Sequence, residues 1–367
     1  MIDPAYTDEV AELRQSCLFD ATFYLSVNED VRAAGVDPLL HFCRDGWREH
    51  RAPNPYFDVG FYLSRDRDLR ASWANPLLHY HQTGERAGLR PGPLFDPGWY
   101  ALAAGLGADE PRLAHFLRHR LDDSACPLRE LYVVPYLDGW RELRGQGVDP
   151  FSGFAAEHDP LPDPVDAEVL LVRASGLFDE NFYLINAPDV LEAQIDPVSH
   201  FCRFGWREAR DPSLYVDIAW YLRTNPVVAA MGVNPLLHYM IAGEAAGRRP
   251  SVCFDPVWYH GRYGPMTGLA LADFMARRRQ QRVSPNALFD VDWYMRNHGE
   301  AVGANRDPFA HYLYAARRED IDPSAEFDAG AYRRRHLGRR SRHFAHIEAR
   351  RELPLLHRLA REYEGGD

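Results

Sequence analysis

One histidine recurs at the same place in a repeated motif, and it is the side chain most able to do chemistry. It lies in segments such as DPLLHF and NPLLHY, and the set is His41, His79, His115, His200, His238 and His311. Several imidazoles on one surface, with carboxylates nearby, could hold a metal ion. Each repeat of about 38 residues contains one of these histidines. The rings of neighbouring repeats should therefore lie a helix pair apart, roughly 10 Å, which is too far to share an ion. We therefore predict a structural hydrogen bond to a neighbouring loop, with no metal and no cofactor.

Acidic residues follow the glycine that ends each motif. The pairs Arg48–Glu49 and Arg207–Glu208 recur, and Glu85 and Glu244 take that place in alternate copies. A retaining glycosidase needs two carboxyl groups about 5 Å apart, whereas this pattern favours a salt bridge or a helix cap between repeats. The segment Asp66–Asp68 is like the Asp-x-Asp of metal-dependent glycosyltransferases, but it aligns with a helix end and no strand precedes it. We predict no catalytic residue; the alternative is an enzyme whose site is built from repeat side chains.

Tryptophan and arginine adjoin at the end of the same motif. Trp47 and Trp206 could stack on sugar rings, although their place just beyond the glycine favours packing in the core. The arginine that follows each tryptophan carries a planar fork that binds carboxylates or stacks on aromatic rings. The candidate ligand-binding residues are Trp47, Trp206, Arg48, Arg207, His41 and His200.

Charge is distributed unevenly along the chain. The net charge is −11, which argues against a nucleic-acid binder because such a protein needs a basic face. Arginines nevertheless crowd one C-terminal segment, with Arg277–Arg279 upstream of it. This asymmetry predicts either a solvated face paired with the protein's own carboxylates or a docking patch for an anionic partner. The candidate patch consists of Arg333, Arg334, Arg335, Arg339, Arg340 and Arg342.

Two helices are expected in each repeat. In FDATFYL, Asp20 is placed to cap a helix, while Phe19 and Tyr24 have the spacing of a hydrophobic staple. The apolar face should continue through Phe23, Val27 and Val31 until Gly35 ends the helix. A second helix should begin at Asp37-Pro38 and end at Gly46 in the left-handed conformation. Stacked hairpins of this kind bury a continuous core.

The same order of motifs returns after 159 residues. We therefore predict an all-α fold of tandem helical-hairpin repeats, each of about 38 residues, in two duplicated blocks over residues 1–158 and 169–326. A proline-rich run, HDPLPDPVD, predicts a non-helical linker over 159–168. Residues 327–367 should form a capping unit and a frayed tail. The repeats begin near Phe19, Phe57, Phe95, Val133, Phe178, Val216, Phe254 and Phe289.

Cysteine usage and hydropathy bear on the compartment. The five cysteines show neither zinc-site nor disulfide spacing, and Cys43 and Cys202 are predicted to be small buried residues. The first residues lack the apolar core of a signal peptide, and no apolar run is long enough to span a membrane. The expectation is a cytoplasmic protein, with export lacking a classical signal peptide as the alternative.

The repeat resembles a family of bacterial repeats of the form F-D-x-x-Y-Y-L-x-x-N-P-D-V…G-x-x-P-L-x-H-Y-x-x-x-G-W-x-E-G-R. FDENFYLINAPDV, DPLLHF and GWREHR carry the resemblance, which covers most of the chain. Such repeats accompany glycosyltransferases of surface polysaccharide synthesis and occur in large secreted bacterial proteins. The resemblance implies a non-catalytic scaffold or binding module linked to surface glycans, with a protein or a glycan as partner. The alternatives are a glycan-modifying enzyme and an oligomerising structural protein.

Overall fold

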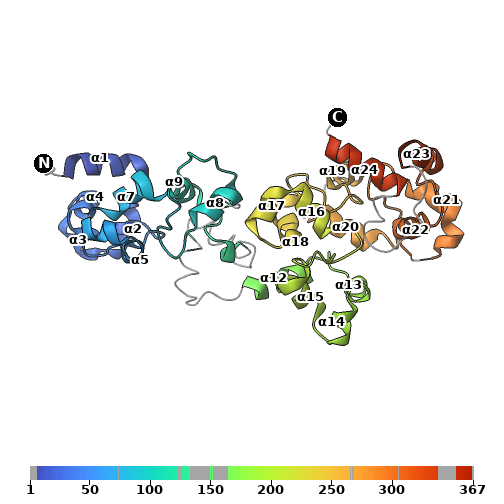
Figure 1. Ribbon diagram of the computed structural model, residues 1–367, viewed down its shortest axis with the longest axis horizontal. Helices are drawn as coiled ribbons and strands as arrows, with labels where there is room; N and C mark the ends of the chain where they lie inside the picture. The colour runs from blue at the N-terminus through green and yellow to red at the C-terminus, as the bar shows by residue number, and fades with distance from the viewer. Residues whose placement is uncertain are drawn as a thin grey trace. The chain divides into compact units, whose positions relative to one another are not determined.

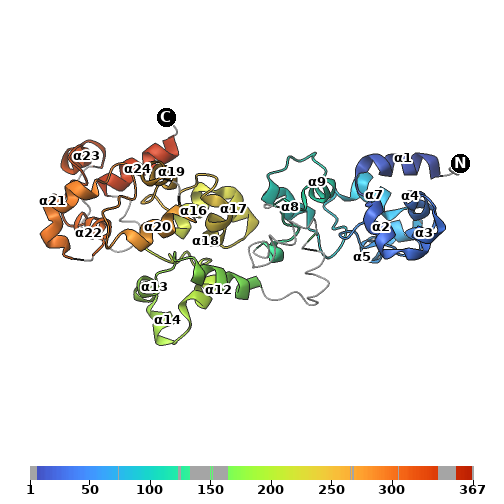
Figure 2. The same ribbon diagram turned by 180° about the vertical axis from the view of Figure 1, so that it is seen from behind.

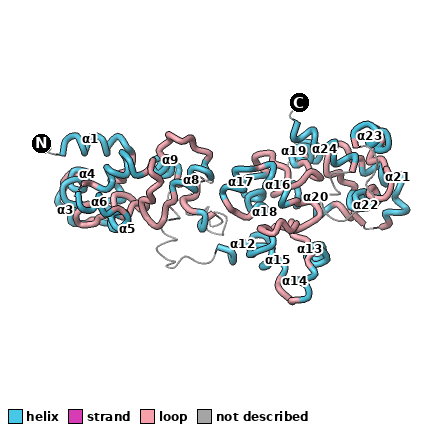
Figure 3. The backbone as a smooth tube through the Cα atoms, in the orientation of Figure 1, coloured by secondary structure: helices cyan, strands magenta, loops and turns pink. Residues whose placement is uncertain are grey.

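The computed structural model describes residues 6–72, 74–122, 125–132, 149, 151, 164–264, 266, 268–304, 306–337 and 353–365. Every regular element in these residues is a helix, as predicted, and loops join the helices (Figure 3). The chain divides into two compact units, Met1–Pro164 and Val165–Asp367, which we call the N-terminal and C-terminal units.

The helices are short, and most span one to three turns. Those that precede the unit boundary are α1 (Thr7–Ser16), α2 (Ala21–Val27), α3 (Glu29–Ala34), α4 (Pro38–His41), α5 (Val59–Arg65), α6 (Arg67–Ser72), α7 (Pro76–His79), α8 (Pro97–Ala104) and α9 (Arg112–His119) (Figure 1). The rest are α12 (Pro164–Ala174), α13 (Glu180–Asn186), α14 (Pro188–Glu192), α15 (Pro197–His200), α16 (Ile218–Thr224), α17 (Pro226–Met231), α18 (Pro235–His238), α19 (Pro256–Tyr263), α20 (Ala270–Arg277), α21 (Val291–Val302), α22 (Pro308–Ala315), α23 (Ala329–His336) and α24 (Pro354–Gly365).

The predicted helix cap at Asp20 and the staple between Phe19 and Tyr24 are confirmed. The Asp20 carboxylate accepts the backbone N–H of Phe23, and the rings of Phe19 and Tyr24 pack with their centroids 5.1 Å apart. The capping contact recurs at seven further aspartates. The backbone N–H of Asp20 also donates to the carbonyl of Pro53, at the far end of the same repeat. The equivalent bond recurs at Asp58, Asp96, Asp179, Asp217, Asp255 and Asp290, so the beginning and end of these repeats are hydrogen-bonded.

The first predicted helix is broken in two in several repeats, where the sequence pattern had predicted one continuous helix. Helix α2 ends at Val27, and Asn28 separates it from α3. The Asn28 side chain donates to the carbonyl of Tyr24, which competes with the helical bonding at this point. The break turns Val27 outward, where 57% of its surface is exposed, while Val31 is buried. The prediction that Val27 belongs to the buried apolar face is therefore wrong.

The predicted role of Gly46 as a left-handed helix stop is wrong. Helix α4 runs directly into a π-helical turn, Phe42–Gly46, and the first positive φ after this turn is at His50. The same π-helical turns end at Gly84, Gly205 and Gly243. A Cβ atom at any of these four glycines would overlap the hydroxyl of a tyrosine from the first helix of its repeat. Glycine is required here for close approach and not for its backbone freedom.

Two expectations about the ends of the blocks need correction. The proline-rich run is helical from Pro164, because proline is tolerated at the first helical position. The tail expected to fray is helical in α24 (Figures 1 and 2). Tyr363 of this helix packs on Trp220 of α16 in the same unit. The predicted repeat near Val133 lies outside the described residues, apart from Asp149 and Phe151.

Replacing Gly84 with alanine tests the close approach. The new methyl group must displace the Tyr62 hydroxyl, so we expect Gly84→Ala to lower the free energy of unfolding by about 1–3 kcal/mol. Gly261, inside α19, has open space around it. Gly261→Ala should therefore be neutral or stabilise the protein by up to about 1 kcal/mol. Urea denaturation of both variants measures the difference, and equal effects would contradict the assignment.

Candidate functional site

The recurring histidines are hydrogen-bonded to buried tyrosines. The Nδ1 atom of His41 lies 3.0 Å from the hydroxyl of Tyr24, on the first helix of the same repeat. The partner is therefore a tyrosine of the preceding helix and not the neighbouring loop that was expected. The other pairs are Tyr62–His79, Tyr100–His115, Tyr183–His200, Tyr221–His238 and Tyr294–His311, at 2.9–3.0 Å.

A seventh pair joins Tyr332 to His357 at 3.0 Å and was missed in the sequence. The signal was present, because PLLH at Pro354–His357 matches the motif, but it lies farther from its tyrosine than in the other repeats. In one repeat an aspartate replaces the histidine, and the hydroxyl of Tyr259 donates to Asp273 at 2.8 Å.

Burial keeps these pairs neutral where the environment is most apolar. It lowers the pKa of His238 to about 4, with a further contribution from Arg248, and it raises the pKa of Tyr221. The tyrosine therefore keeps its proton, and the hydrogen bond joins a neutral hydroxyl to an uncharged imidazole. In the part of the chain that the structure describes, no group of three or more His, Cys, Asp or Glu side chains could hold a metal ion.

Glu85 and Glu244 cap helices of the following repeat. The Glu85 carboxylate accepts the backbone N–H groups of Arg112 and Leu113 at the start of α9, and the hydroxyl of Tyr80 at 2.9 Å. Glu244 does the same for Ala270 and Leu271 at the start of α20. Glu49 instead pairs with Arg51 inside its own repeat, at 2.6 Å. Asp66 caps a helix through the N–H of Leu69.

An arginine joins distant repeats within each compact unit. Arg120 pairs with Asp20 at 3.0 Å and with Asp149 at 3.5 Å, and Asp149 also accepts the hydroxyl of Tyr56. The equivalent cluster in the C-terminal unit consists of Arg278, Asp179, Asp307 and Tyr215. The Arg278 side chain, 11% exposed, is therefore largely enclosed by these contacts. Arg277, beside it, pairs with Asp273 at 2.8 Å.

The two candidate tryptophans are buried and equivalent. Trp47 and Trp206 each donate from the indole nitrogen to a cysteine carbonyl, Cys43 or Cys202, at 3.1 Å. The following arginine covers each ring, with Arg48 4.3 Å and Arg207 4.2 Å from the ring centroid. Neither tryptophan offers an open face for stacking on a sugar.

The next repeat differs in sequence near the two tryptophans, because Ser64 and Arg70 in the first block correspond to Arg223 and Ala229 in the second. Trp47 and Arg48 line a cavity of about 230 Å³ with residues of the next repeat, and its wall contains no carboxylate. The full lining is Trp47, Arg48, His50, Gly60, Leu63, Ser64, Leu69 and Arg70. His41 and His200 are held by their tyrosines and do not line this cavity.

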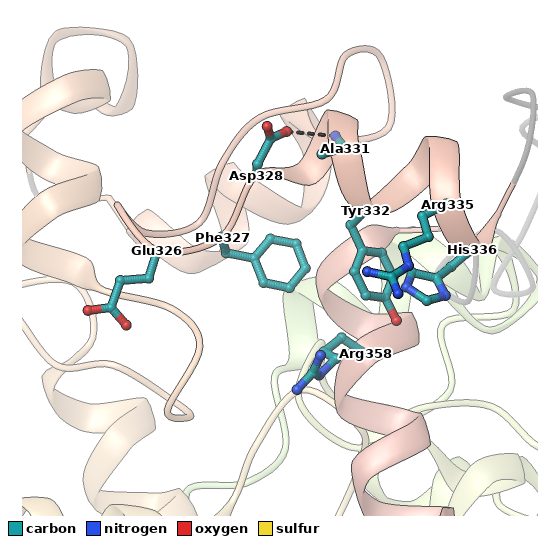
Figure 4. Close-up of a pocket in the computed structure, with 8 residues that line it drawn as sticks. All are labelled: Glu326, Phe327, Asp328, Ala331, Tyr332, Arg335, His336 and Arg358. Atoms are coloured by element: carbon teal, nitrogen blue, oxygen red, sulfur yellow. Dashed lines mark hydrogen bonds between the residues drawn. The ribbon is translucent and has the colours of Figure 1, made fainter.

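The structure separates the members of the predicted arginine patch. Arg333 is buried and pairs with Asp320 at 2.7 Å, so it belongs to the core. Arg334 and Arg335 are exposed. Arg339, Arg340 and Arg342 lie outside the described residues. Arg335 lines a second cavity of about 280 Å³, together with His336 and Arg358 (Figure 4).

Comparisons with family models, with curated proteins and with solved structures found no match to this chain. Among the described residues, no helix combines the length and the apolar character needed to cross a membrane. The four cysteines Cys43, Cys126, Cys202 and Cys253 are buried with free thiols, and Cys17 is exposed. Burial raises the pKa of the Cys43 and Cys202 thiols.

The Tyr221–His238 pair predicts a pH dependence of stability. The folded protein disfavours protonation of His238, whose pKa lies below its ordinary value of 6.5. Its contribution is therefore complete above pH 6.5 and is lost as the pH falls toward 4, by up to about 3 kcal/mol. In His238→Gln this part of the pH dependence should disappear. Urea denaturation between pH 7 and pH 4 measures it, and an unchanged slope would contradict the assignment.

Removing the cap formed by Glu244 should be costly. Its side chain is 6% exposed, and Glu244→Ala leaves the Tyr239 hydroxyl and the first N–H groups of α20 without this acceptor. We expect the free energy of unfolding to fall by about 2–4 kcal/mol. Glu208→Ala is the control, because that carboxylate is 46% exposed and pairs only at the surface. Similar losses in both variants, measured by thermal unfolding, would contradict the proposed cap.

Proposed function

We propose that this protein is a non-catalytic binding scaffold whose ligand is an acidic bacterial surface glycan. The observation that carries the proposal is the cavity at Trp47 and Arg48, where residues singled out for ligand binding meet residues of the next repeat. The link to glycans comes from the resemblance of the repeats to those that accompany surface-polysaccharide glycosyltransferases.

The lining of this cavity suits an acidic sugar. Arg48 and Arg70 place two guanidinium groups at a wall without carboxylates, and such groups bind carboxylate or phosphate with two parallel hydrogen bonds. Ser64 and His50 add hydrogen-bonding groups for sugar hydroxyls, and Leu63 adds an apolar surface. The wall is drawn from two successive repeats, so the repeat-to-repeat packing shapes the cavity.

The contacts of the recurring polar residues support binding over catalysis. A general base or metal ligand must reach its substrate or ion, whereas the repeated histidines are engaged with buried tyrosines. The carboxylates of Glu85 and Glu244 hold helix ends. These residues stabilise the fold, and ligand binding is therefore expected at the surface between repeats.

Arg48 and Arg207 form a matched pair for testing the proposal. Both stack on a tryptophan, so alanine at either position removes the same internal contact, but only Arg48 lines the cavity. We expect the protein to bind acidic surface-polysaccharide fractions saturably, and Arg48→Ala to weaken binding about tenfold or more. Arg207→Ala should leave binding unchanged. Isothermal titration calorimetry measures each affinity.

The same titrations are repeated at higher ionic strength and with neutral polysaccharides. Binding through Arg48 and Arg70 should weaken as the ionic strength rises, and neutral polysaccharides should bind poorly. Equal loss of binding in both variants, or no binding to any fraction, would overturn the proposal. The second result would favour a scaffold that docks proteins.

A further inference from the structure

An aromatic residue follows the recurring histidine and packs on the first phenylalanine of its repeat. In the first repeat, Phe42 follows His41, and its ring centroid lies 5.6 Å from that of Phe19. The same contact, at 5.3–5.7 Å, joins Phe57–Tyr80, Phe95–Phe116, Phe178–Phe201, Phe254–Phe274 and Phe289–Tyr312. The repeat thus contains a slot that an aromatic ring normally fills.

The last described repeat departs from this rule. His357 makes the usual hydrogen bond to Tyr332, which establishes the alignment, and the next residue is Arg358. The rest of the helix keeps its apolar side, because Leu355, Leu356 and Leu359 are buried. A charged, flexible side chain therefore replaces the aromatic ring at a single position.

A cavity of about 280 Å³ opens against the rings that normally enclose this slot. Phe327 forms one wall and Tyr332 another, while Arg335, His336 and Arg358 gather on the side of Tyr332 (Figure 4). In the first repeat the corresponding rings, Phe19 and Tyr24, both pack on Phe42. Among the described residues, no ring takes the place that Phe42 has in the first repeat, and the cavity lies there with a cation at its edge.

Arginines gather on the side of the cavity near His336, where Arg335 is exposed and Arg358 pairs with Glu362 one turn further along α24. Loss of solvent around the ring, and then the charges of Arg335, Arg361 and Arg358, lower the pKa of His336. Asp328 also lines the cavity, but its carboxylate accepts the N–H of Ala331 as the cap of α23. Glu326 lies at the opposite end, apart from Arg335 and Arg358 (Figure 4).

We propose that this cavity is a second ligand site, which binds a sugar carrying a carboxylate or a phosphate. The apolar face of the sugar would lie against Phe327, and Arg335 and Arg358 would hold the oxyanion. The inference depends on the last repeat alone. It holds whether or not the cavity at Trp47 binds a glycan.

The decisive variant is Arg358→Phe, which restores the residue type of the other repeats. It should fill the slot, raise the melting temperature and abolish binding. The probes are glucuronate, glucose 6-phosphate, inorganic phosphate and glucose, titrated into the full chain and followed by ligand-observed NMR. We expect the two acidic sugars to bind saturably and more tightly than phosphate, while glucose does not bind. Glucuronate against glucose 6-phosphate distinguishes the two oxyanions.

Arg335 and Arg334 supply the matched controls. Both are exposed, adjacent and carry the same charge, but only Arg335 lines the cavity. Arg335→Ala should weaken binding of the acidic sugars about tenfold or more, and Arg334→Ala should not. The proposal is overturned if the acidic sugars bind Arg358→Phe and the wild type with equal affinity. It is also overturned if they do not bind the wild type. Inorganic phosphate that binds as tightly as glucose 6-phosphate would remove the role of Phe327.

Discussion

The fold depends on one buried contact, the hydrogen bond between a tyrosine hydroxyl and the histidine 17 residues later in most repeats. A buried hydroxyl without a partner is costly. The histidine must therefore occupy the one position on the second helix from which it reaches the tyrosine. Where the π-helical turn is present, its glycine admits the hydroxyl against the backbone, and a side chain at that position would block the approach. Cap, staple and π-helical turn all serve to bring these two side chains together.

The repeats are joined into compact units by polar contacts as well as by their apolar core. Glu85 caps the helix of the repeat that follows, and Arg120 draws together Asp20 and Asp149, which are far apart in the chain. Asp20 thus has two roles, because its carboxylate both caps a helix and pairs with Arg120. These side chains are partly buried, and removing one partner would leave the other charges poorly compensated. The cluster therefore ties the register of one repeat to that of the others.

Local signals predicted the helix starts because capping and the staple act between residues only a few positions apart, as at Asp20, Phe19 and Tyr24. The all-α class followed from the repetition of those signals. The tyrosine partner of His41 and the reason for Gly46 could not be predicted, because both depend on how close two helices approach. The Asn28 break was visible only as a polar residue in an otherwise helical pattern. For the candidate site, the place of Trp47 and Trp206 beyond the glycine favoured their burial, whereas the burial of Arg333 depends on its packing against Asp320.

Equivalent positions with unequal surroundings are where function is most readily separated from architecture. Trp47 and Trp206 make the same hydrogen bond and carry the same stacked arginine, so these contacts belong to the scaffold. What distinguishes them is the neighbouring repeat: Ser64 in the first block corresponds to Arg223 in the second. Arg358 extends the same logic, because it occupies a position that packing reserves for an aromatic ring. A repeat with arginine in place of this ring loses buried apolar surface and therefore stability. Binding of an acidic sugar by Arg358, as proposed above, would offset that loss.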